Sequence, residues 1–182
     1  MKTDIRLIAL DLDGTLLDSQ KRLSARNEAV LQECISRGIY IVPCTGRIWG
    51  GVPEFLRSLP GIRYAITTNG AIVEDVAEHR ILDERKLGCA QAVDILELAG
   101  KFHTMYDAYV DGCAYGEKRF MEHMDDYAIP DTIQTMILQT RQEVPDVKER
   151  IRMLNLPVEK INYFFWRSAG ACPRKTCAAG AW

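Results

Sequence analysis

The sequence predicts an α/β fold with a partial doubly wound parallel sheet, and three observations lead to this prediction. The apolar run Leu7–Leu10 ends in acidic residues, a helix-like segment follows, and the β-branched run Ile39–Val42 comes next. Strands that alternate with helices usually form a parallel sheet with helices packed on its faces. The order of these segments therefore favours an open, Rossmann-like sheet that presents polar residues at the carboxyl ends of its strands.

The first domain is expected to span 1–84. Ser24 is placed to cap a helix that runs to about Arg37, because apolar residues recur there at helical spacing and Gly38 follows. The further elements predicted in this domain, in chain order, are a helix near 53–59, a strand over 64–67, and a hairpin of strands 71–74 and 80–82.

A second α/β domain is expected over 85–166, because helix and strand patterns continue there with their own apolar positions. The turn pair Asp111-Gly112 predicts a hairpin between two of its strands. The expected elements are a helix over 89–99, strands over 104–110 and 113–115, helices near 120–124 and over 146–154, and a strand over 158–166.

The segment 167–182 has no apolar period and is rich in Ala, Gly and Cys, so an atypical, disordered tail is expected there. Two origins stay open for it, a native extension or a product of an altered reading frame. The sharp change in composition favours the second origin.

Composition argues against several classes of function. A net charge of −2 offers no basic surface for nucleic acid. No apolar run approaches the roughly 20 residues that span a bilayer, and no signal-like segment precedes the first strand, so we expect a cytoplasmic protein with no membrane partner. The six cysteines include no CxxC pair, so reduced thiols are expected.

The acidic segment after the first strand gives the strongest indication of chemistry. Asp11 and Asp13 stand two residues apart beside an apolar wall, and Gly14 lets the backbone turn sharply after them. Such a carboxylate pair favours a hard cation. Asp-Gly is also a common turn pair, so a plain turn is the structural alternative.

The string hhhDxDGTLLDS, which covers 8–19 in this chain, resembles the first motif of the haloacid dehalogenase-like (HAD) hydrolases. Most of these enzymes are phosphatases that form a phospho-aspartyl intermediate. The resemblance implies that Asp11 is the nucleophile and that Asp13 is the general acid and then the general base. It also implies Mg²⁺ as the cofactor, with the Asp11 side chain and the Asp13 backbone carbonyl as ligands.

The residues after the second strand resemble the second family motif. Thr45 and Gly46 would hold the transferring phosphoryl group through a hydroxyl and backbone N–H groups, and Arg47 would add positive charge near the substrate. A strand-to-helix turn and a solvated surface arginine are the structural alternatives. Asn69 lies in Thr-Asn-Gly-Ala, which resembles a recurring family segment near the crevice and is equally readable as a turn.

Together with the large insertion after them, these segments resemble the Cof-type subgroup, whose cap is an α/β domain. Members of this subgroup mostly remove phosphate from sugar phosphates and other small phosphorylated metabolites, and the cap decides which one. The resemblance therefore implies a phosphoric monoester hydrolase with a small metabolite as its partner.

The sequence departs from the family pattern after the second domain. The family's lysine motif and its final acidic metal motif are absent, so we interpret the chain as truncated within or just after an incomplete cap. Activity is then expected to be impaired, and self-association through an exposed sheet edge is expected.

Two alternatives stay open. One is a catalytically inactive remnant that binds phosphate or metal without turnover. The other is a receiver domain that accepts phosphate on an aspartate, although the adjacent Asp-x-Asp-Gly-Thr favours the hydrolase.

Overall fold

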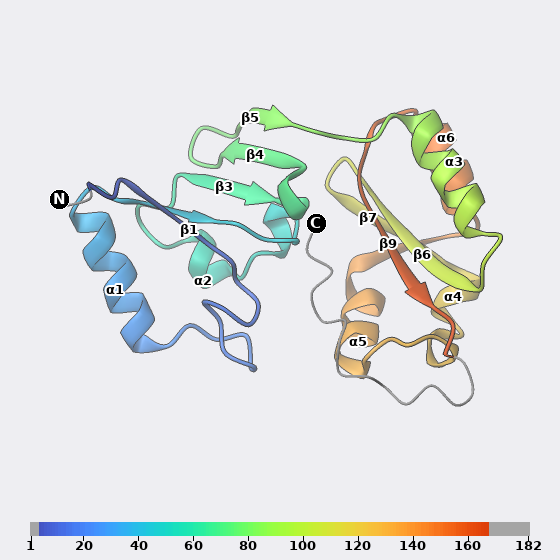
Figure 1. Cartoon of the computed structure of the whole chain (residues 1–182), viewed down its shortest axis with the longest axis horizontal. Coiled ribbons are helices and arrows are strands. Elements are labelled where there is room, and N and C mark those ends of the chain that lie inside the picture. The colour runs from blue at the N-terminus through green and yellow to red at the C-terminus, as the bar shows by residue number, and fades with distance from the viewer. Residues whose placement is uncertain (1–3, 168–182) are drawn as a thin grey trace. The chain divides into compact units, whose positions relative to one another are not determined.

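The computed structural model describes residues 4–167, which divide into two compact units between Arg85 and Lys86 (Figure 1). Both units combine strands with helices, and parallel and antiparallel pairings occur in the described chain, which confirms the α/β class. The assignment of the units as a hydrolase core and a cap stays a prediction. The disordered tail was predicted for 167–182, of which 168–182 lie outside the described residues.

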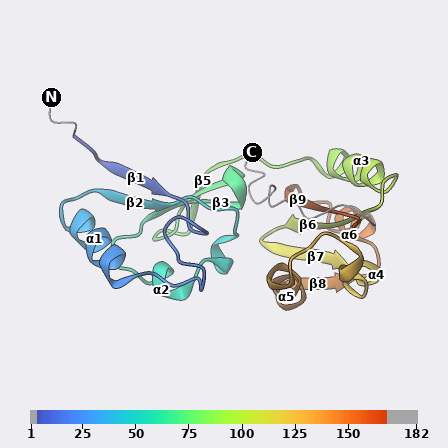
Figure 2. The ribbon, with the colours of Figure 1, turned by 60° about the horizontal axis from the view of Figure 1, so that its bottom comes forward.

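Unit 1 contains a parallel strand pair and an antiparallel sheet of three strands. Its elements are β1 (Leu7–Leu10), α1 (Ala25–Ser36), β2 (Tyr40–Pro43), η1 (Trp49–Gly51), α2 (Glu54–Arg57), β3 (Tyr64–Thr67), η2 (Thr68–Gly70), β4 (Ile72–Asp75) and β5 (Arg80–Glu84). The helices α1 and α2 lie on the same face of these strands (Figure 1, Figure 2).

The strands of unit 1 bring three loops to one edge. β1 and β2 pair in parallel with Leu10 opposite Pro43, so the chain leaves both strands at the same end. A parallel bridge between Cys44 and Ile66 continues this arrangement to β3. The segments that follow β1, β2 and β3 therefore emerge side by side, as expected for an open parallel sheet.

Helix α1 begins and ends where the sequence predicts. The Ser24 side chain accepts a hydrogen bond of 3.1 Å from the backbone N–H of Asn27. Gly38 lies just beyond the helix with a φ of 78°, a left-handed conformation that a residue with a side chain adopts only at a cost. Leu31 faces inward and joins the apolar core of the unit.

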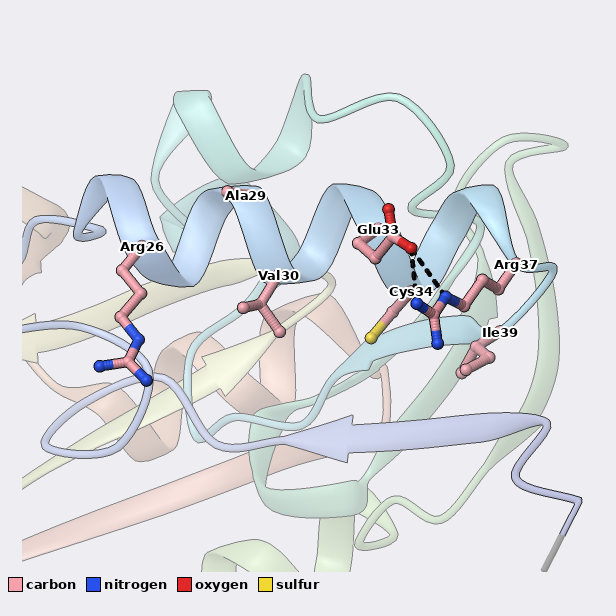
Figure 3. Close-up of a pocket in the computed structure, with 7 residues that line it drawn as sticks. All are labelled: Arg26, Ala29, Val30, Glu33, Cys34, Arg37 and Ile39. Atoms are coloured by element: carbon pink, nitrogen blue, oxygen red, sulfur yellow. Dashed lines mark hydrogen bonds and ion pairs between the residues drawn. The ribbon is translucent and has the colours of Figure 1, made fainter. Parts of the chain in front are cut away.

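The outer edge of β1 and one side of α1 are exposed in this unit. Within the described residues β1 pairs only with β2, and Leu7 is 52% exposed. A pocket also runs along one side of α1, where Val30 is 55% exposed and Glu33 pairs with Arg37 (Figure 3). The self-association expected through the strand edge stays a prediction.

Unit 2 is built on a sheet in the order β8-β7-β6-β9, in which only β7 and β8 are parallel. Its elements are α3 (Cys89–Ala99), β6 (Thr104–Val110), β7 (Cys113–Glu117), α4 (Lys118–Met121), η3 (Met124–Asp126), α5 (Asp131–Thr140), β8 (Arg141–Val144), α6 (Val147–Leu154) and β9 (Val158–Phe165). Helices α3 and α6 pack against each other (Figure 1).

Unit 2 differs from the sequence prediction at three places. The helix expected near 120–124 is two short pieces, α4 and η3. Helix α5 and strand β8 were not predicted, and α5 runs directly into β8 without an intervening turn. The four cysteines within the described residues are free thiols.

No helix in the span 4–167 is long and apolar enough to cross a membrane.

Replacing Leu12 with alanine tests how the core positions the acidic segment. Leu12 is fully buried between two exposed aspartates, so Leu12→Ala leaves a cavity and is expected to lower the free energy of unfolding by about 2–5 kcal/mol. Urea unfolding measures this change. Val30→Ala on the exposed side of α1 is the matched control and should change stability by about 0.5 kcal/mol or less. Equal effects of the two substitutions would contradict the anchoring role of Leu12.

Candidate active site

The acidic segment begins where β1 ends. Asp11 and Asp13 are exposed, while Leu12 between them points into the core. Gly14 has a φ of 79°, which lets the backbone reverse directly after the second carboxylate. The buried leucine therefore holds two outward carboxylates on a short turn.

The side chain of Asp11 has a single hydrogen bond recorded within the described residues. Thr15 Oγ1 donates to Asp11 Oδ2 over 3.2 Å, and the backbone N–H of Leu16 donates to the Asp11 carbonyl over 3.2 Å. The second carboxylate oxygen of Asp11 is therefore available to a ligand at the end of the strand.

Asp13 is paired with two cations. Arg47 approaches it with two nitrogens, Nε to Oδ2 at 2.9 Å and Nη2 to Oδ1 at 2.8 Å. Lys21 Nζ lies 2.7 Å from Oδ1. The hydrogen bonds from Arg47, opposed by partial burial and aided by Lys21, hold the pKa of Asp13 at about 2. Asp13 is therefore ionised at neutral pH.

The loop after β2 places Thr45, Gly46 and Arg47 beside the acidic segment. Thr45 is buried, and its hydroxyl oxygen accepts a hydrogen bond of 3.2 Å from the backbone N–H of Arg47. A threonine hydroxyl that accepts one hydrogen bond can still donate one. The hydroxyl of Thr45 is thus fixed in place while its proton can point to a ligand.

The turn after β3 supports this loop from the other side. The backbone N–H of Thr68 donates to the carbonyl of Arg47 over 2.9 Å, and that of Asn69 donates to the carbonyl of Thr45 over 3.1 Å. Thr68 and Asn69 have φ values of 52° and 59°, in the left-handed region. A β-branched residue is rarely found there, and such strain clusters at functional sites.

The structure thus joins most of the residues that the sequence singled out. Asp13 contacts Arg47 through their side chains, and Asn69 reaches Thr45 through its backbone. The described structure records no direct bond between Asp11 and the others. Lys21 was not predicted from the sequence, because it belongs to no motif and reaches Asp13 only through the fold of the loop that contains it.

The oxygen donors of this segment suit a magnesium ion. Asp11 offers a carboxylate and Asp13 a backbone carbonyl, and Mg²⁺ is often bound by one or two carboxylates together with water and substrate phosphate. No group of three or more His, Cys, Asp or Glu side chains suited to a metal occurs among residues 4–167. Neither Asp11 nor Asp13 lines the pocket along α1 (Figure 3).

Comparisons with known proteins identify the family of this chain. The family of haloacid dehalogenase-like hydrolases matches residues 8–167. Among curated proteins, the phosphatase YwpJ of Bacillus subtilis is 31% identical over 121 residues, which is 66% of this chain and 42% of that protein. The 5-amino-6-(5-phospho-D-ribitylamino)uracil phosphatase YcsE of the same organism is 35% identical over 104 residues, or 57% of this chain and 41% of that protein.

A solved structure has a similar fold. A haloacid dehalogenase-like hydrolase from B. subtilis has 26% sequence identity and a TM-score of 0.62, with coverage of 80% of this chain and 56% of that one. The chain therefore spans about two fifths of the length of these two curated relatives and about half of the solved structure.

Replacing Arg47 tests its effect on the pKa of Asp13. Without the guanidinium, Arg47→Met is expected to raise the pKa of Asp13 from about 2 toward the usual value of 3.8, and carbon-detected NMR titration measures this. Because the folded pKa is depressed, the stabilisation is present above about pH 3.8 and is lost as the pH falls through about 2.

Arg26→Met, on the exposed part of α1, is the control and should leave the titration of Asp13 unchanged. An unchanged pKa in Arg47→Met would show that the pairing does not exist in solution.

Proposed function

The chain belongs to the haloacid dehalogenase-like hydrolases, and from this membership we propose that it acts in the hydrolysis of phosphoric monoesters of small metabolites through a phospho-aspartyl intermediate. The single observation that carries the proposal is the exposed carboxylate of Asp11 at the carboxyl end of β1, two residues before a second carboxylate. Ligands of open α/β sheets bind at this end of the strands.

The proposed reaction has two steps. An oxygen of Asp11 attacks phosphorus, an aspartyl–phosphorus bond forms, and the bond to the alcohol breaks. The departing alkoxide takes a proton from Asp13, which is the general acid. In the second step water gives a proton to Asp13 and attacks the aspartyl phosphate, which returns Asp11 and releases phosphate.

The ion pairs of Asp13 with Arg47 and Lys21 determine when it can act as general acid or as general base. Arg47 and Lys21 favour the ionised carboxylate, which is the form that accepts a proton from water. The donor role needs the protonated form, so both cations must loosen their hold on Asp13 when the substrate enters. The negative charge of the phosphoryl group supplies a competing partner for them.

Thr45, Gly46 and Asn69 are proposed to hold the transferring phosphoryl group, with Arg47 as positive charge beside Asp13. Preorganised hydrogen-bond donors are effective here because phosphoryl transfer is catalysed mostly by positioning and electrostatic stabilisation. The two backbone bonds from the turn after β3 fix the loop before the substrate arrives. That preorganisation is what supports the assignment of these residues.

We propose Mg²⁺ as the cofactor, held by the Asp11 carboxylate and the Asp13 backbone carbonyl, and when bound it would reduce the repulsion between Asp11 and the phosphoryl oxygens. Small phosphorylated metabolites are the proposed substrate class, in keeping with the names of the similar phosphatases. Neither nucleic acid nor a membrane is a proposed partner, and a cytoplasmic location is the matching proposal.

A second candidate function is binding of phosphate or metal without turnover. The observation that favours it is the double pairing of Asp13, which keeps the proposed general acid ionised. Titration calorimetry with Mg²⁺ and beryllium fluoride separates the two functions, because binding without phosphate release would support the second.

Replacing Asp11 with asparagine tests the proposed nucleophile. Asp11→Asn is expected to lower phosphate release from p-nitrophenyl phosphate in MgCl₂ by about a thousandfold or more, because an amide oxygen is a poor nucleophile. Steady-state release of inorganic phosphate by the 182-residue chain is the measurement.

Asp94→Asn, at an exposed position on α3, is the matched control and should retain the rate of the unaltered chain. Turnover retained by Asp11→Asn would rule out Asp11 as the nucleophile. Absence of phosphate release from the unaltered chain would leave the binding function as the better account.

A further inference from the structure

The loop after the acidic segment is folded around Asp18. Its carboxylate oxygen Oδ1 accepts hydrogen bonds of 2.8 Å and 2.9 Å from the backbone N–H groups of Gln20 and Arg22. The backbone of Asp18 adds two further bonds, because its N–H donates to the carbonyl of Arg22 and its carbonyl accepts from the N–H of Lys21. Hydrogen bonds from Arg22 and Gln20 lower the pKa of Asp18 despite some desolvation, so the carboxylate acceptor persists at neutral pH.

This loop holds Lys21 in a strained conformation. Lys21 has a φ of 61°, in the left-handed region, which a residue with a side chain adopts only at a cost. An exposed ion pair is only weakly stabilising, so the pair with Asp13 does not offset that cost alone. The bonds to Asp18 keep the turn, and the turn directs the lysine side chain to Asp13.

The two cations on Asp13 differ in what they can still bind. Arg47 uses Nε and Nη2 on Asp13, and its Nη1 donates to the carbonyl of Gly51 over 2.8 Å. These bonds use three of the five N–H groups of the guanidinium and fix its plane, so Arg47 cannot turn toward an incoming anion without breaking a bond.

Lys21 has donors to spare. An ammonium group carries three N–H donors, and the contact recorded for Lys21 Nζ within residues 4–167 is the one to Asp13. The side chain is 55% exposed, whereas that of Arg47 is 28% exposed. Lys21 can therefore bind an anion next to Asp13 through its remaining N–H donors.

We propose that Lys21 binds the phosphoryl group of the substrate directly, and that Arg47 is a positioning residue that orients Asp13. This inference rests on the proposed function of the same site. The positive charge that contacts the substrate then comes from a residue of the loop directly after the acidic segment, where the sequence shows no motif.

Binding of inorganic phosphate to the full chain tests the assignment without relying on turnover. Titration calorimetry in MgCl₂ should show that Lys21→Met weakens phosphate binding about tenfold or more, since a hydrogen bond to a charged group is worth about 1.5–3 kcal/mol. Lys21→Arg keeps the charge and should restore affinity to within about threefold of the unaltered chain. Arg26→Met is the control and should bind phosphate normally.

Kinetics separate the two roles where the chain turns over. Lys21→Met should raise KM and leave kcat nearly unchanged, because the lost contact is present in the ground state and the transition state alike. Arg47→Met should lower kcat and move the acidic limb of the pH–rate profile, because Asp13 is then misoriented. Such a movement would not follow from a merely structural arginine.

The outcomes for this inference and for the proposed function are distinct. Unchanged phosphate affinity in Lys21→Met, or no phosphate binding by the unaltered chain, would overturn the role of Lys21. Weakened binding in Lys21→Met in a chain without turnover would support Lys21 and refute the phosphatase proposal alone. Circular dichroism of each variant confirms that the fold is retained.

Discussion

The ion pair between Asp13 and Arg47 is the interaction on which the arrangement of the candidate site depends. The two residues are 34 positions apart and come from the loops after β1 and β2. The two parallel hydrogen bonds between them fix direction as well as distance, because a guanidinium and a carboxylate are both planar. Parallel pairing of β1 with β2 brings these loops to one edge, and the ion pair then sets how their side chains face each other.

The turn after β3 has a strained backbone that supports the loop after β2. Left-handed backbone at Thr68 and Asn69 turns two successive N–H groups toward the carbonyls of Arg47 and Thr45. An ordinary extended backbone would not present both donors to one loop. The strained turn thus holds the loop after β2 rigid. Through Arg47 that rigidity extends to Asp13.

The sequence predicts what local signals determine. The acidic turn, the Ser24 cap of α1 and the strand pattern of unit 1 all depend on neighbouring residues, and the structure contains them. Helix α5 has several β-branched residues and no turn residue before β8, so local patterns gave no boundary there. The contact of Lys21 with Asp13 was missed for a different reason, since it requires the fold of an intervening loop.

An ion pair between residues far apart in the sequence also links strands in the sheet of unit 2, and no local sequence pattern predicts it. Arg141 on β8 reaches across β7 to the buried carboxylate of Asp107 on β6, with a distance of 2.9 Å. Gly116 on β7 stands directly opposite Asp107. Burial raises the pKa of Asp107 although Arg141 opposes the shift, so this pair adds little to net stability. Its specific effect is on register, because a slip of either strand by one residue would leave a buried charge without its partner.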